Sequence, residues 1–81
     1  MYANHTLKLP NRVHISNKRG ATNAHAILDT IKRHFASTAL TYGELVLRLQ
    51  RGYMSVLVAD EDKRLALALD LESIGVQVEI T

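Results

Sequence analysis

The sequence predicts a small α+β fold in which the elements follow the order β-α-α-β-α-β and helices cover one face of a three-stranded sheet. Polar and apolar residues alternate where we expect strands, whereas apolar residues recur every three or four positions where we expect helices. Signals for helix starts and ends stand between these segments. The length of 81 residues fits a single domain that spans residues 1–81.

The first predicted strand includes Val13 and Ile15, whose neighbours on either side are polar. Leu7 and Leu9 continue the alternation upstream, so an extra N-terminal strand is an alternative. Pro10 interrupts the pattern between the two pairs. Because proline cannot donate to a central ladder, we expect either two short strands in a hairpin or an edge strand with a bend.

Two helices are predicted next. Thr22 or Asn23 can cap the first helix, and a capping box formed by Thr41 and Glu44 opens the second, which Gly52 ends. In the box, each side chain can satisfy a backbone amide of the other residue. The apolar stripes that we expect to be buried are Ala24, Ile27, Leu28, Ile31 and Phe35 in the first helix, and Leu45, Val46 and Leu49 in the second.

The rest of the chain predicts a strand, a helix and a strand. Residues 53–59 form a β-rich run, and Asp60 then caps a third helix whose first-turn carboxylates favour the positive end of the helix dipole. Gly75 is placed to end this helix. The final strand alternates between apolar and polar residues, with Val76, Val78 and Ile80 on its apolar side.

Size and composition favour a binding module over an enzyme. A catalytic cleft of roughly 300 Å³ or more would take a large share of so small a core. The net charge of +2 permits contact with an acidic protein or a nucleic acid without demanding either. We expect no cofactor, and we can name no catalytic group, because no set of nucleophile, base and orienting residue stands out.

The absence of cysteine excludes disulfides and thiolate metal sites. Four histidines are present, but none are spaced i, i+4 as metal ligands on one helix face often are, so we expect no metal site. The sequence has no apolar run of about 20 residues and no signal-peptide core, which indicates no membrane partner and a cytoplasmic protein.

Two segments resemble known families. The segment VHISN…AILDTIKRHF is similar to the strand, loop and first helix of the ClpS adaptor fold. The segment LVADEDKRLALALDLESIGVQVEIT looks like the closing strand, helix, glycine and strand of the C-terminal domain of the bacterial ribosomal stalk protein. Together the resemblances run from Val13 to Thr81 and imply a ClpS-like or stalk-domain-like fold. Both families dock on partner proteins, which implies an adaptor or inhibitor of a larger machine such as a AAA+ protease or the translation apparatus.

The resemblance to ClpS weakens in the loop after the first strand. In that family an asparagine and following acidic residues grip the free α-amino group of a substrate. Here Asn17 matches, but Lys18 and Arg19 take the acidic places and would repel an ammonium group. Amino-end recognition is therefore not carried over. The stalk domain holds translational GTPases with its first helix, and the resemblance implies Lys32 as a basic contact residue.

We predict two groups of partner-binding residues. Asn17, Lys18 and Arg19, which precede a helix start, could hold an anion on an acidic partner surface, although an ordinary solvated turn is the alternative. On the third helix, the stripe that we expect to face the core contains Leu67, Leu71 and Ile74. Leu65 and Leu69 point about 180° away from it, which suggests contact with another chain or a homodimer. The alternative is that they are ordinary exposed leucines or are covered by the loop or the first segment.

The alternative function is that of a small basic nucleic-acid-binding protein. The residues that could contact phosphates are Arg12, Lys18, Arg19, Arg48 and Arg51. The aromatic residues that single-strand binders interleave with such cations are few in this chain. Arg48 and Arg51 could equally form ordinary charge pairs along their helix. The sequence leaves the identity of the partner open.

Overall fold

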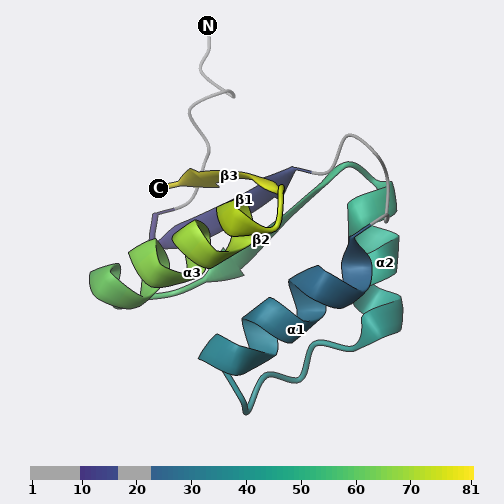
Figure 1. Ribbon diagram of the computed structural model, residues 1–81, viewed down its shortest axis with the longest axis horizontal. Helices are drawn as coiled ribbons and strands as arrows, with labels where there is room; N and C mark the ends of the chain where they lie inside the picture. The colour runs from purple at the N-terminus through teal and green to yellow at the C-terminus, as the bar shows by residue number, and fades with distance from the viewer. Residues whose placement is uncertain (1–9, 17–22) are drawn as a thin grey trace, which may run out of the picture.

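A computed structural model describes residues 10–16 and 23–81 (Figure 1). The elements in order are β1(Arg12–Ser16), α1(Ala24–His34), α2(Tyr42–Gln50), β2(Tyr53–Leu57), α3(Glu61–Ser73) and β3(Gln77–Ile80). This order confirms the predicted α+β class. The alternative extra strand lies outside the described residues, as does the loop that contains Asn17, Lys18 and Arg19.

The three strands form an antiparallel sheet in the order β2-β1-β3, with Ile15 opposite Met54 on one side and Val78 on the other. Because β1 is the central strand, the interpretation of this segment as an edge strand is wrong. Pro10 precedes the strand and takes no donor from its ladder. The chain turns at Asn11, whose φ of 61° lies in the left-handed region that asparagine tolerates.

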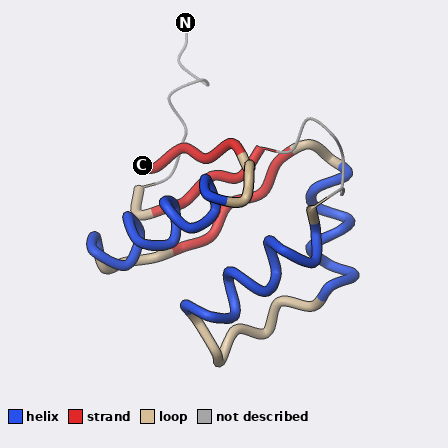
Figure 2. Tube along the Cα trace, in the orientation of Figure 1, coloured by secondary structure: helices blue, strands red, loops and turns tan. Residues whose placement is uncertain are grey.

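All three helices pack on one side of this sheet (Figures 1 and 2). Helix α3 lies against β1 and β3, α2 lies against β2, and α1 packs against both other helices. Val13 and Ile15 of β1 are fully buried beneath them, as the alternating pattern predicts. The other buried core residues are Ala24, Ile27, Leu28, Ile31, Leu45, Leu49, Met54, Val58, Leu67, Leu71 and Val76.

The helix starts follow the capping signals only in part. Thr41 Oγ1 accepts a hydrogen bond from the Glu44 amide at 3.2 Å, but the Glu44 carboxylate accepts from the Thr41 hydroxyl instead of a backbone amide. Asp60 Oδ1 accepts from the Lys63 amide at 3.0 Å, as predicted. Asn23 precedes α1 without a side-chain cap, because its ψ of 25° departs from the extended conformation that caps adopt.

The helix ends match the glycine signals. Gly52 follows α2 with a φ of 91°, and Gly75 follows α3 with a φ of 86°. A residue with a side chain would be strained in this left-handed conformation, so glycine allows each helix to stop and turn directly into a strand. The strands are shorter than predicted. Strand β2 ends at Leu57, and beyond it the Val58 amide still donates to the Asn11 carbonyl, which continues the ladder with the β1 side by one hydrogen bond.

Candidate docking surface

Helix α3 carries leucines on two opposite sides. Leu67 and Leu71 are fully buried against the sheet and α1. Leu65 and Leu69 remain 46% and 65% exposed, although α3 packs on both a sheet and a helix. The structure therefore confirms that these two leucines point away from the core.

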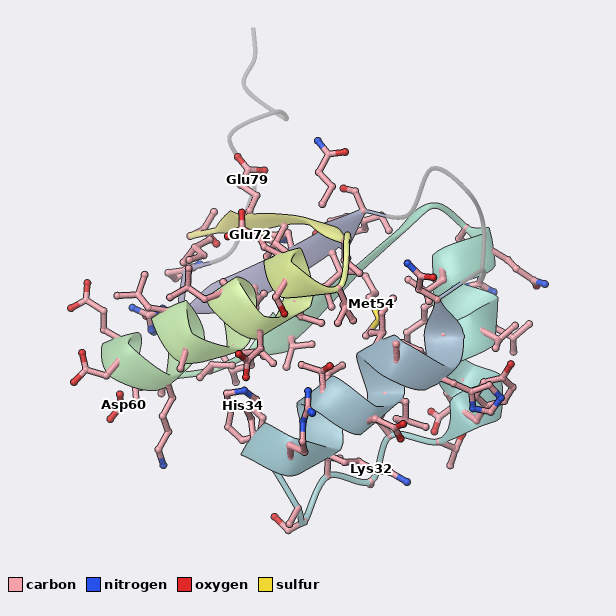
Figure 3. The ribbon with its side chains drawn as sticks, viewed as in Figure 1. Lys32, His34, Met54, Asp60, Glu72 and Glu79 are labelled. Atoms are coloured by element: carbon pink, nitrogen blue, oxygen red, sulfur yellow. The ribbon has the colours of Figure 1, made fainter. Side chains whose placement is uncertain are left out.

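Carboxylates stand at both ends of this leucine pair. With 100° of rotation per residue, one arc of about 80° around α3 contains Glu61, Leu65, Leu69 and Glu72. Asp62 lies at the edge of that arc. All five residues are exposed. We call these five residues the α3 surface. Figure 3 labels Asp60 and Glu72, which mark the two ends of the helix that carries it.

Two of these carboxylates have a structural reason for their position, but the third does not. Glu61 and Asp62 lie in the first turn of α3, where negative charge is stabilised by the helix dipole. Glu72 lies near the C-terminal end, where the dipole disfavours a negative charge, and the last turn of α3 contains no basic residue. Among the described residues, Glu72 forms no ion pair. Its position therefore costs stability in the isolated chain.

Lys32 lies on a different surface. It is exposed near the end of α1, and its side chain points away from α3 (Figure 3). Basic residues are favourable at that end because the last turn of a helix is the negative end of its dipole. The structure therefore does not bring Lys32 together with Leu65 and Leu69, and Asn17, Lys18 and Arg19 are outside the described residues.

Three of the arginines predicted to contact phosphates lie within the described residues, and they do not lie together. Arg48 and Arg51 are exposed at the end of α2, close to where β2 begins at Tyr53. Tyr53 pairs with Ser16 at one end of β1, whereas Arg12 lies at the other end of this strand. The strand is about 13 Å long at the usual rise per residue. Arg12 is half-buried, and its buried Nε atom has no hydrogen-bond partner among the residues that the structure describes. The described arginines therefore do not form one basic patch.

His14 has a structural role that no pattern in the sequence indicates. On the sheet face turned away from the helices, His14 is only 3% exposed, and its side chain connects β1 to β2 and to the residue that follows β3. Its Nδ1 lies 2.9 Å from the Tyr53 hydroxyl and its Nε2 lies 2.9 Å from Thr81 Oγ1. Either tautomer fits, because a hydroxyl can donate or accept. A histidine at the centre of a strand signals such burial only when the neighbouring strands are known.

Two other histidines join helices. The His25 ring of α1 stacks on Tyr42 at the start of α2, with ring centroids 4.2 Å apart. His34 Nε2 donates to Asp70 Oδ2 of α3 at 2.6 Å, and Figure 3 shows His34 pointing from α1 toward α3. These contacts give both residues structural roles. Within residues 10–16 and 23–81, no three acidic or histidine side chains come together in a manner that could hold a metal ion.

Comparison of this chain with protein-family models, with curated proteins and with solved structures finds no match. In the described part of the chain, none of the helices has the length and apolar character needed to cross a membrane. The geometry of the exposed residues therefore supplies the main argument about function.

Proposed function

We propose that the protein is a non-enzymatic binding module that docks on a larger protein through the α3 surface. Its role would be that of a cytoplasmic adaptor or inhibitor. The observation that carries this proposal is the exposure of Leu65 and Leu69 on a helix whose opposite side buries Leu67 and Leu71 completely. Two leucines one turn apart form the minimal apolar stripe by which one helix packs on another surface.

The size of the surface indicates a modest affinity. Standard protein interfaces bury about 800 Å² on each partner, which is more than the outer side of a helix like α3 can supply. We therefore expect a dissociation constant of roughly micromolar order unless other elements add contacts. Lys32, Asn17, Lys18 and Arg19 remain proposed additional contacts for an acidic part of the partner.

The test is an affinity capture from bacterial lysate with matched leucine variants. Wild-type protein is compared with Leu69→Ser on α3 and with Leu47→Ser on α2. Leu47 is a suitable control because it is 58% exposed, close to the 65% of Leu69, but lies on another helix. Parallel samples are treated with nuclease, and circular dichroism checks that each variant is folded.

The proposal predicts one protein complex that the wild type and Leu47→Ser retain, that Leu69→Ser loses, and that survives nuclease. The captured protein, once purified, should bind the wild type directly with the same dependence on Leu69. Equal capture by all three chains would contradict a role for α3. Material that disappears with nuclease would favour the alternative function of nucleic-acid binding through the basic residues.

A further inference from the structure

We propose that the α3 surface receives a basic amphipathic helix of the partner protein. This inference rests on the proposed function and specifies the chemistry of the partner at the docking site. The surface combines an apolar centre with an acidic border, and each part selects a different property of the ligand. The leucines select an apolar stripe, and the carboxylates select lysine or arginine beside that stripe.

The apolar centre fits a helix. Leu65 and Leu69 lie one turn apart on α3, and both side chains are exposed to solvent. A partner helix that places two aliphatic residues at the same spacing can pack between them in the usual arrangement of side-chain ridges and grooves. An extended segment would instead need a free sheet edge, which the α3 surface does not offer.

The acidic border fits a basic partner. Glu61 and Asp62 precede Leu65 by one turn, and Glu72 follows Leu69 by one turn. Within the described residues none of the three carboxylates forms an ion pair, whereas the neighbouring Asp70 is paired with His34. Lysine or arginine residues on either side of an apolar stripe would therefore meet unpaired negative charges at both ends of the surface.

Glu72 provides the most specific argument. Its charge opposes the dipole of its own helix, and no basic residue of the last turn compensates it. A cation brought by a partner would remove this unfavourable interaction at the moment of binding. The position is thus unfavourable in the free chain and favourable in a complex with a basic ligand.

The same charges disfavour a second copy of this chain as the occupant. In an antiparallel α3–α3 pair, Glu61 and Asp62 of one chain would approach Glu72 of the other. In a parallel pair, each carboxylate would approach its own counterpart. Both arrangements place like charges across a small interface, which lowers affinity and selects against self-association.

The distribution of charge along the chain also favours a basic partner at α3. Residues 1–52 contain eight lysines and arginines but only two acidic residues. Residues 53–81 contain two lysines and arginines and six acidic residues. The acidic part includes α3 and β3, and α3 contributes Glu61, Asp62, Asp70 and Glu72. An approaching basic segment would therefore be steered toward the α3 side of the molecule.

The experiment uses the full chain and two synthetic peptides of about 15 residues, long enough to become helical on binding. One peptide has two leucines one turn apart with lysines on both sides, and the other has glutamates in place of the lysines. Binding is measured by fluorescence anisotropy, and the site is mapped by shifts of backbone amide resonances. Sedimentation of the free chain measures self-association.

We expect the lysine peptide to bind and to shift resonances of residues 61–73, with affinity that falls as salt increases. Leu69→Ser should lose about tenfold or more in affinity, and Glu72→Gln about two- to fivefold. Leu47→Ser should bind like the wild type. Equal binding of the glutamate peptide, shifts confined to other elements, or a dimer that Leu69→Ser dissociates would each overturn the inference.

Failure of this inference and failure of the proposed function can be told apart. If lysate capture depends on Leu69 but the lysine peptide does not bind, the surface docks a partner of other chemistry, and only the inference is wrong. If the lysine peptide binds the α3 surface but lysate capture does not depend on Leu69, the proposed function is wrong.

Discussion

His34 and Asp70 connect helix α1 to helix α3 through a hydrogen bond of 2.6 Å between the imidazole Nε2 and a carboxylate oxygen. His34 is the last residue of α1, and Asp70 lies on α3 next to Leu69. The pair therefore holds the helix that carries the α3 surface against its neighbour. Asp70 thus already has a partner within the chain, in contrast to Glu61, Asp62 and Glu72, which form no ion pair within the described residues.

Asp70→Asn is expected to destabilise the fold slightly. The His34 side chain is 19% exposed and that of Asp70 is 51% exposed, so solvent screening limits the contribution to about 0.2–1 kcal/mol. Urea denaturation of the variant measures the change in the free energy of unfolding. Asp29→Asn serves as the control, because Asp29 is an exposed acid on α1 without an ion pair in the described structure. Equal effects of the two substitutions would contradict a role for the pair.

Glu72→Gln is expected to stabilise the free protein by about 0.3–1 kcal/mol, because it removes a negative charge from the C-terminal end of α3. The matched substitution is Glu61→Gln, which removes the same charge from the first turn and should destabilise the protein by a similar amount. Thermal denaturation of both variants at low salt measures the two shifts. Shifts of the same sign would contradict the assignment of the dipole effect.

Asn11→Ala is expected to be less stable than Asn11→Gly by about 1 kcal/mol. Both variants lose the hydrogen bond of 3.0 Å that Asn11 Oδ1 accepts from Arg64. Only glycine adopts the φ of 61° at this position without strain. The comparison therefore separates the backbone conformation from the side-chain contact. If alanine and glycine give equal midpoints of urea denaturation, the left-handed turn before β1 does not limit stability.

Tyr53→Phe is expected to destabilise the sheet by about 0.5–1.5 kcal/mol, because the His14 ring loses the hydroxyl at Nδ1. Tyr42→Phe provides the control. Tyr42 is exposed, and within the described residues its hydroxyl has no hydrogen-bond partner, so its loss should change stability little. Chemical denaturation monitored by circular dichroism measures both. A Tyr53→Phe variant as stable as the wild type would show that the His14 contact adds nothing to the sheet.

The order of the elements could be predicted because the boundaries of α2 and α3 carry local signals. Asp60, Gly52 and Gly75 determine where helices begin and end through contacts or conformations within a few residues. The central position of β1 could not be predicted, because it depends on which strands pair over long distances. For the same reason, the sequence did not indicate that His14 is buried between Tyr53 and Thr81.

The candidate site was predicted in part. Helical spacing alone places Leu65 and Leu69 opposite the core, and the structure confirms this placement. The role of Glu72 in an acidic border depends on the register of α3 and on where this helix ends, so it was recognised only in the structure. The predicted basic loop of Asn17, Lys18 and Arg19 lies outside the described residues, so its role remains a prediction.

The most direct test of the central claim is photo-crosslinking in bacterial cells with p-benzoylphenylalanine in place of Leu69 or, as a control, in place of Leu47. Both side chains are exposed to a similar extent, but only Leu69 belongs to the α3 surface. If α3 is a docking surface, position 69 should give a crosslinked product with one other protein and position 47 should not. No product from position 69, or the same products from both positions, would contradict the claim that α3 is a docking surface.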